Sequence, residues 1–392
     1  MSHKIIHMLI LCAGRNRRTR NTDLQVLGQM EKKSNLQNEY SLTVDVKALQ
    51  ALRGLAFVGI FLGHFYYFGW TPISVSVFFV LSGFLLTINE SRKYEEYTLK
   101  DSFREAKRRI FKLYPLHLVL TVICIPLAIV REDVFSIGDL ILKLVCNVFM
   151  VQSLVPSANI AASLNGVAWY LSTIFILYIV FPFIYRVFYR IKNADTLRIM
   201  LLFTIFFQTA MVFIVYRTIY YETVITYMTH CFPVYRVFDL IAGIQLALLL
   251  TVKEERNVDF NPTVYTVIEV LIFVLSGDLV FLWTTGDTNI FYTHAPVTTL
   301  LAILFTFVFS KKKGVLTKLL TNKVLVFLGD RSGSAFLIHF PIVVYINTFI
   351  FPHLTRLRRT IIHGVCLPVA VVSTLVLSYL YDTKIKPKLK RK

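Results

Sequence analysis

Arg53 and His64 are two residues of this chain whose types and spacing favour chemistry. They lie eleven positions apart inside one apolar run, Ala51-Leu-Arg-Gly-Leu-Ala-Phe-Val-Gly-Ile-Phe-Leu-Gly-His-Phe65. An α-helix rises roughly 16 Å over eleven residues, and about three turns bring both side chains onto nearly the same face. An arginine at the centre of a bilayer costs about 2.5–3.5 kcal/mol or more, so such residues are usually functional. The structural alternative is that Arg53 is a snorkelling anchor at a helix end and His64 a satisfied core histidine.

Two further motifs combine polar side chains with apolar runs. In Phe78-Phe-Val-Leu-Ser-Gly-Phe84, Ser82 precedes a glycine. Such small pairs let membrane helices approach closely, so helix packing is the structural alternative there. Arg108-Arg-Ile-Phe-Lys-Leu-Tyr-Pro115 opens another run, with its proline near the helix start. Because guanidinium planes suit phosphate recognition, Arg108, Arg109 and Lys112 are candidate contacts for an anionic cofactor.

Two later segments add ionisable groups within apolar runs. Gly329-Asp-Arg-Ser-Gly-Ser-Ala-Phe-Leu-Ile-His339-Phe-Pro341 places a second histidine about two turns into its run. Arg236-Val-Phe-Asp239 puts a cation and a carboxylate at i, i+3, where they pair on one helix face. His339 therefore joins the candidate site, whereas Arg236 and Asp239 are substrate-binding or purely structural candidates.

The composition predicts an all-α, polytopic membrane protein. The 392 residues are 56% hydrophobic, with a mean hydropathy of +0.62, against about 45–50% apolar residues in ordinary soluble domains. Many apolar runs reach the roughly 18–20 residues that cross about 30 Å of hydrocarbon. The net charge of +19 would favour nucleic acid in a soluble protein, but here the basic residues cluster between apolar runs, where membrane topology explains them. We therefore expect the lipid bilayer as a partner and no nucleic acid.

We predict about ten membrane-spanning helices with both termini in the cytoplasm. Lys and Arg gather in the connections that this topology places inside, with Arg356, Arg358 and Arg359 as the exception. Asp139 and Lys143 interrupt the stretch 137–155, which we interpret as an amphipathic surface segment rather than an eleventh span. The spans are predicted near 50–68, 72–89, 113–130, 168–188, 199–216, 236–252, 264–284, 292–310, 333–351 and 361–381.

The predicted bundle fills residues 46–383, between a polar, disordered cytoplasmic tail (1–45) and a short basic tail (384–392). Segment 98–113 has apolar residues on one helical face and basic residues on the other, which is typical of a helix on the inner leaflet. Attraction to anionic lipid explains most of that basic face, and binding of an anionic cofactor is the functional alternative. The five cysteines show no C-x-x-C spacing, so we expect neither a disulfide framework nor a metal site.

In this order, the motifs resemble the membrane-bound acyltransferase-3 family, bacterial integral-membrane O-acyltransferases that decorate surface glycans. The resemblance runs from about Val46 to Pro387. Leu52-Arg53-Gly54 and His64 match the family's Leu-Arg-Gly opening and its Arg-x10-His spacing. The family's other elements are matched by Phe78–Phe84, by Arg108–Pro115 with Lys112 for an arginine, by Trp169-Tyr-Leu-Ser172, and by Ser332–Pro341 with Phe336 for a tyrosine.

This chain departs from the family pattern at two carboxylates. Ile174 stands where the family often has glutamate, and Ile385-Lys-Pro387 replaces the usual Glu-Lys-Pro. A carboxylate from those positions is therefore missing as an orienting partner for the histidine, and Asp239 is a candidate substitute. Ser82, Trp169 and Ser172 are carried over as substrate-binding or structural candidates.

The resemblance implies transfer of an acyl group, most often acetyl, from an acyl-CoA such as acetyl-CoA to a sugar hydroxyl at the bacterial cytoplasmic membrane, with no permanently bound cofactor. A sugar hydroxyl is a poor nucleophile until a base takes its proton, and the ordinary histidine pKa of ~6.5 suits that role. We expect His64 to be the general base or, alternatively, a transient acyl carrier. Arg53 would hold the donor, His339 would complete the pocket, and the coenzyme A phosphates would contact Arg108, Arg109 and Lys112.

The acceptor and the protein class each have alternatives. Capsular or exopolysaccharide, or its lipid-linked precursor, is the first choice of acceptor, followed by teichoic acid, peptidoglycan, lipopolysaccharide sugars and small glycosides. No soluble esterase-like domain follows the last predicted span, so we expect the bundle to do both donor and acceptor chemistry or to pass the acyl group to a separate polysaccharide-assembly protein. The main alternative class is a transporter or flippase, although the two halves show no convincing internal repeat. A structural scaffold is the third protein class, and such a protein would not need Arg53 and His64 to face one cavity.

Overall fold

A computed structural model of the chain describes residues 44–66, 70–90, 94, 96–131, 136–252, 260–285, 296–350 and 356–389. Regular secondary structure in these ranges is helical, without a strand, which confirms the predicted all-α class. The predicted N-terminal tail lies outside the described residues except for its last two positions. The first half contains α3 (Val46–Tyr66), α4 (Thr71–Glu90), α5 (Leu99–Ile110), α6 (Tyr114–Ile123), α7 (Ile125–Arg131), α8 (Ile137–Val148), η2 (Gln152–Leu154), α9 (Ala158–Ala161) and α10 (Trp169–Phe188).

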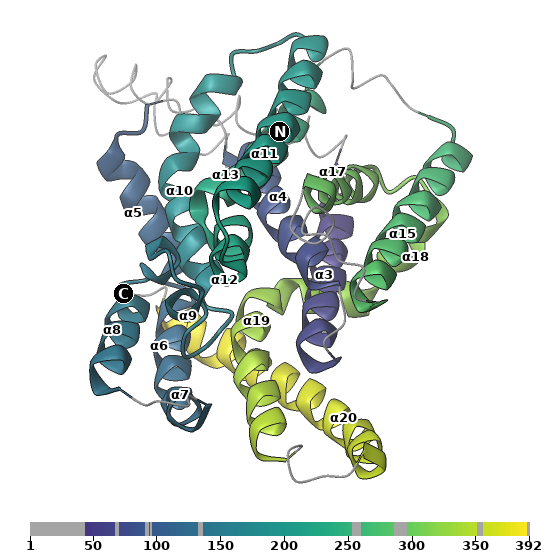
Figure 1. Cartoon of the computed structure of the whole chain (residues 1–392). Helices are drawn as coiled ribbons and strands as arrows, with labels where there is room; N and C mark the ends of the chain where they lie inside the picture. The colour runs from purple at the N-terminus through teal and green to yellow at the C-terminus, as the bar shows by residue number, and fades with distance from the viewer. Residues whose placement is uncertain are drawn as a thin grey trace, which may run out of the picture. The chain divides into compact units, whose positions relative to one another are not determined.

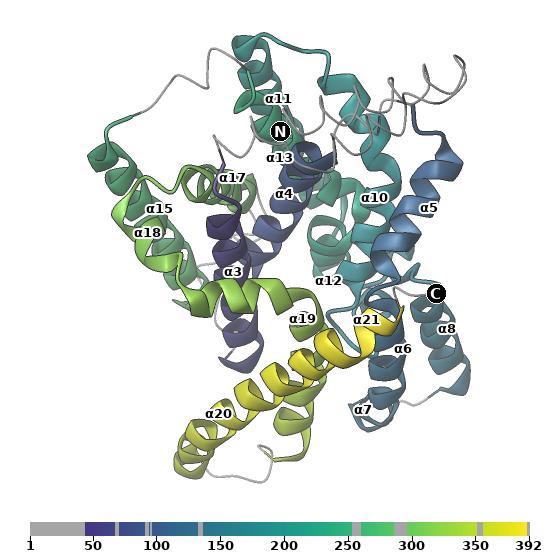
Figure 2. The same cartoon turned by 180° about the vertical axis from the view of Figure 1, so that it is seen from behind.

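The second half continues the helical arrangement, and in both views α3 lies beside α19 while α5 lies beside α10 (Figure 1, Figure 2). Its elements are α11 (Ala194–Thr218), α12 (Glu222–Thr226), the π-helix η3 (Tyr227–Cys231), α13 (Pro233–Leu249), α15 (Pro262–Thr285), α17 (Pro296–Lys311), α18 (Val315–Leu320), α19 (Lys323–Phe349), α20 (Arg356–Leu380), the π-helix η5 (Tyr381–Ile385) and α21 (Lys386–Leu389).

Eight helices within the described ranges are long and apolar enough to cross a membrane, and the bent pair α6–α7 makes a ninth if it forms one span. The bend of 41° follows from Pro126, which has no N–H to continue the helix. The 16-residue helix α17 falls in the predicted span 292–310, whose first residues lie outside the described part of the chain. The 12-residue helix α8 is too short to span, and Asp139 and Lys143 form an ion pair of 2.5 Å on it.

α3 begins four residues earlier than predicted because Asp45 caps it. The Asp45 carboxylate accepts a hydrogen bond of 2.8 Å from the Ala48 N–H, which satisfies a first-turn donor. Arg53 therefore lies in the first half of α3, and His64 lies in its last turn. The arginine and the histidine thus lie in opposite halves of the same helix.

Glycine pairs set the two closest helix contacts around these residues. Gly54 of α3 meets α19, where a Cβ would overlap the Leu325 carbonyl, and Gly329 in turn lies against the α3 backbone. Gly83 of α4 and Gly243 of α13 pack in the same way. The glycines of the Leu-Arg-Gly and Ser-Gly motifs therefore allow close helix crossing, and these crossings hold α3 against α19 and α4 against α13.

α5 is the amphipathic helix predicted for segment 98–113. Its buried face consists of Ser102, Ala106 and Ile110, and it packs against α10. The Thr98 side chain and backbone N–H donate to Asp101 in a capping box, and these hydrogen bonds hold the pKa of the Asp101 carboxyl below its usual range. We call the part of the bundle at the last turn of α5, which carries Lys107, Arg108 and Arg109, the basic end.

Candidate functional site

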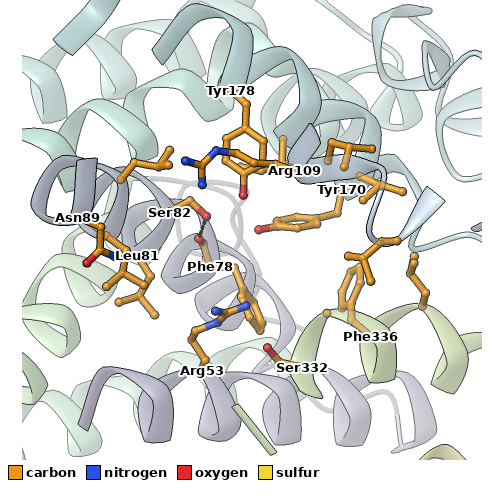
Figure 3. Close-up of a pocket in the computed structure, with 18 residues that line it drawn as sticks. Arg53, Phe78, Leu81, Ser82, Asn89, Arg109, Tyr170, Tyr178, Ser332 and Phe336 are labelled. Atoms are coloured by element: carbon orange, nitrogen blue, oxygen red, sulfur yellow. Dashed lines mark hydrogen bonds between the residues drawn. The ribbon is translucent and has the colours of Figure 1, made fainter. Parts of the chain in front are cut away.

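A cavity of about 260 Å³ lies between α3, α4, α5, α10 and α19 (Figure 3). Apolar side chains make much of its wall, among them Phe78 and Phe336. Polar groups project into it from several helices, with Arg53 and Arg109 approaching from opposite walls (Figure 3). The polar lining residues are Arg53, Ser82, Asn89, Arg109, Tyr170, Tyr178 and Ser332.

Arg53 is a cation that faces this cavity without a carboxylate partner among the described residues. Its Nη1 has a long contact of 3.4 Å to the Gln50 amide oxygen. The Gln50 amide nitrogen donates to the Asp330 carboxylate at 2.7 Å, so Gln50 links Arg53 to Asp330. A guanidinium placed in this way in an apolar bundle is costly unless an anion binds it, and the cavity is therefore suited to an anionic ligand.

Arg109 supplies the second cation of the cavity and is held firmly. It forms an ion pair of 3.0 Å with Glu105, donates to the Tyr94 hydroxyl at 3.0 Å, and lies over the Tyr178 ring at 5.7 Å. Arg108, by contrast, is 58% exposed, pairs with Glu105 at 2.7 Å, and is not among the lining residues. Lys112 does not line the cavity either, and its carbonyl accepts a hydrogen bond of 3.0 Å from the Tyr381 hydroxyl.

His64 and His339 meet directly, although 275 positions separate them in the sequence. His64 Nδ1 lies 3.0 Å from His339 Nε2. His339 is fully buried and His64 half-buried. The rings of Phe61 and Phe340 pack around the pair, at 5.8 Å from His339 and 5.3 Å from His64, respectively. The two predicted histidines thus form one unit inside an aromatic shell.

The hydrogen-bond partners of the pair fix its protonation pattern. His339 Nδ1 faces the Ala335 carbonyl oxygen at 3.3 Å, and an oxygen of this kind only accepts, so Nδ1 carries the proton. His339 Nε2 is then the acceptor for the Nδ1–H of His64. In the neutral pair, His64 Nε2 keeps its lone pair, which is the state that a general base requires.

A layer of three rings separates this histidine pair from the cavity. The centroids of Phe78, Tyr170 and Phe336 lie 5.3–6.4 Å apart, and Phe336 is 5.9 Å from the His339 ring. The described lining residues of the cavity include Arg53 but neither histidine. We expected Arg53 and His64 to look into one space; in this conformation they lie on the two sides of the ring layer.

Of the remaining motif residues, Ser82 lines the cavity and donates to the Phe78 carbonyl at 2.7 Å. Trp169 and Ser172 hold the start of α10. Trp169 packs on His230 at 4.8 Å, and the Ser172 hydroxyl donates to the Met150 carbonyl at 2.7 Å. The structural interpretation therefore fits Trp169 and Ser172 better than direct substrate contact.

Arg236 and Asp239 form the centre of a buried polar network. They are 2% and 0% exposed and pair at 2.8 Å. Asp239 also accepts from Thr299 at 2.5 Å and from Gln208 at 3.1 Å, which joins α13 to α17 and α11. These partners occupy the carboxylate that we considered as a substitute for the missing glutamates, and His64 is oriented by His339 instead.

The motif comparison did not identify Asn89, Tyr170 and Tyr178 as lining residues of the cavity. A signal for them exists in the sequence, because each places a polar group inside a predicted apolar span, where such groups need a partner. The Tyr170 hydroxyl points into the cavity between Ser82 and Arg109 (Figure 3).

Comparison with known proteins identifies the class to which this bundle and site belong. The chain matches the family described as "Acyltransferase domain", the acyltransferase-3 family, over residues 46–382, and it belongs to this family. It is 37% identical over 115 residues to the acyltransferase MdmB of Streptomyces mycarofaciens, a match that covers 29% of this chain and 28% of that protein. No solved structure matches the chain. The predicted resemblance is confirmed: the chain is a member of the acyltransferase-3 family with several helices that could span a membrane.

Proposed function

We propose that this protein is an O-acyltransferase of the bacterial cytoplasmic membrane that moves an acyl group, most often acetyl, from an acyl-CoA to a hydroxyl of a surface polysaccharide or its lipid-linked precursor. The observation that carries the donor assignment is Arg53, a cation with no carboxylate partner in the described chain, which shares one cavity with Arg109. The donor supplies the phosphates and the thioester oxygen that such groups bind.

The size of the cavity supports a particular placement of the donor. Its volume of about 260 Å³ is small, since sites that enclose a drug-sized ligand measure about 300–1,000 Å³. The acyl group and part of the pantetheine arm would occupy the cavity, while the nucleotide would lie outside it at the basic end. There α5 presents the exposed cations Arg104 and Lys107 as well as the inward-facing Arg109, whereas Arg108 is paired with Glu105 at the surface.

His64 would take the proton of the acceptor hydroxyl on Nε2. As the hydroxyl oxygen attacks the thioester carbonyl, the new C–O bond forms, the C–S bond breaks, and the coenzyme A thiolate leaves. The His64 imidazolium then returns the proton to the thiolate. His339 stabilises the charged ring by accepting from Nδ1–H at 3.0 Å. A transient acyl group on His64 Nε2 is the alternative route, and acid-quenched protein that carries label from the donor would reveal it.

The acyl group must pass the ring layer of Phe78, Tyr170 and Phe336 to reach His64. The layer consists of side chains alone, so a change in their rotamers would open it without a movement of the helices. The acceptor would approach from the other side, because His64 lies in the last turn of α3, remote from the basic end. This arrangement favours a glycan acceptor at the outer half of the membrane and a cytoplasmic donor.

Donor binding by purified protein in nanodiscs tests the donor assignment. Labelled acetyl-CoA should bind wild-type protein, and Arg53→Ala should weaken binding at least tenfold, as expected for loss of a charge-assisted contact worth about 1.5–3 kcal/mol. Lys47→Ala is the matched control, because Lys47 is an exposed cation on the same helix. Equal donor affinity in all three proteins would refute the donor site. The acceptor is tested separately by NMR of surface polysaccharides from a deletion strain, which should lack the acyl esters of the parent.

A further inference from the structure

Asn165 and Gly166, between α9 and α10, have no role in the mechanism described so far. The Asn165 side chain is fully buried, and its amide nitrogen donates to the Leu337 carbonyl of α19 at 3.0 Å. In a regular helix that carbonyl would accept from the N–H of residue 341. Residue 341 is a proline, which has no N–H and pushes against the carbonyl four positions earlier. Asn165 therefore supplies the hydrogen bond that Pro341 removes from α19.

Gly166 makes the second contact of this segment with α19. A Cβ at position 166 would lie 2.6 Å from the end of the Phe340 ring, so only glycine permits the observed packing. Phe340 also contacts the site on its other side. Its ring stands edge-on to the His64 ring, with centroids 5.3 Å apart and planes at 85°. Phe340 is thus held between Gly166 and His64.

These two contacts flank His339 on α19. Leu337, bonded by Asn165, precedes it by two residues, and Phe340, packed by Gly166, follows it directly. His339 in turn faces His64 Nδ1. We propose that Asn165 and Gly166 are positioning residues for the acyl transfer: they fix the kinked part of α19 and the Phe340 ring so that His339 holds His64 with Nε2 free for the acceptor hydroxyl. This inference rests on the proposed function only for its kinetic consequence.

A purely structural role would give different results, and Gln152 provides the matched control. Gln152 is also a fully buried amide, and its nitrogen donates at 3.1 Å to the Ala168 carbonyl, at the other end of the same connection. This hydrogen bond goes to the connection rather than to α19. Replacing Asn165 or Gln152 by leucine removes one buried amide in each case, but only Asn165→Leu frees the carbonyl beside His339.

Steady-state kinetics of acyl transfer are the first readout. Asn165→Leu should lower kcat roughly 10- to 100-fold, since a displacement of about 1 Å in a reacting group can cost 10²-fold, and should change the KM for acetyl-CoA less than about threefold. Adding Pro341→Ala returns an N–H to Leu337 and should recover part of the lost kcat. Equal kcat losses in Asn165→Leu and Gln152→Leu, or no recovery in the double variant, would overturn the proposal.

A second pair of variants covers the case in which Asn165→Leu does not fold. Gly166→Ala should lower kcat because the new methyl group displaces the Phe340 ring toward His64, and Phe340→Leu should restore activity by removing the end of that ring. Failure of Phe340→Leu to rescue Gly166→Ala would count against the proposed positioning.

¹⁵N NMR of histidine-labelled protein separates this inference from the proposed function. The signal of His64, assigned by its loss in His64→Gln, should show a hydrogen-bonded Nδ1–H in wild-type and Gln152→Leu protein, and this signal should shift in Asn165→Leu. If wild-type protein transfers no acyl group, the proposed function fails, while the NMR comparison still decides whether Asn165 orders the histidine pair. An unchanged His64 signal in Asn165→Leu would refute the positioning role.

Discussion

Replacing His339, which accepts a hydrogen bond from His64, tests most clearly whether His64 must be oriented by a partner to act as the base. His339→Leu removes the nitrogen that accepts from His64 Nδ1 at 3.0 Å, while it keeps a side chain of similar size in the fully buried site. A hydrogen bond to a group that becomes charged is worth about 1.5–3 kcal/mol. At about 1.36 kcal/mol per decade, kcat should fall roughly 10- to 150-fold, whereas His64→Ala should cost about 10²- to 10⁴-fold.

The assay measures transfer of label from acetyl-CoA to unacetylated glycan from a deletion strain, in membrane vesicles with matched protein levels. His339→Gln is the conservative variant, because its amide oxygen can accept from His64, and it should retain more activity than His339→Leu. The double variant His64→Ala/His339→Leu should be no slower than His64→Ala, since His339 acts through His64. A double variant whose loss equals the product of the two single losses would refute this relation, as would a His339→Leu variant with wild-type kcat.

Three further outcomes follow from the packing and charges of the bundle. Arg109→Gln should raise the KM for acetyl-CoA roughly tenfold. Arg108→Gln should change this KM less than about twofold, because Arg108 forms an exposed ion pair at the surface. Equal changes in KM would contradict the assignment of Arg109, and not Arg108, to the donor site. Arg236→Met should destabilise the protein in detergent by about 3–5 kcal/mol by leaving a buried carboxylate unpaired, and the Arg236→Met/Asp239→Leu double variant should be more stable than the single one. Gly83→Leu would overlap a carbonyl of α13 and should abolish monodisperse protein in gel filtration; normal elution would contradict the helix contact.

The sequence predicted the fold well because apolar length and basic connections are strong local signals in a membrane protein. The differences from prediction arise from single residues that act on helix ends. Asp45 starts α3 early, and Pro126 bends the predicted third span into α6 and α7. The stretch 137–155 was correctly excluded as a span; its interrupting residues Asp139 and Lys143 pair with each other.

The site was only partly predictable, because its geometry depends on contacts between helices. Helical periodicity placed Arg53 and His64 on one face, but the ring layer between their environments includes side chains from α4, α10 and α19, which spacing within α3 cannot reveal. Which of two neighbouring basic residues faces the cavity also depends on contacts between helices. Arg108 and Arg109 differ by one position, about 100° around a helix, and this decides which of them reaches the cavity.

Single-turnover acetyl transfer by His64→Ala protein in nanodiscs is the most direct test that His64 is the base of the reaction. Binding of labelled acetyl-CoA is measured on the same sample, so that donor binding and chemistry are separated. We expect donor affinity within about threefold of wild type and a transfer rate lower by about 10²- to 10⁴-fold. Transfer at the wild-type rate, or a loss explained entirely by weaker donor binding, would contradict the assignment of His64.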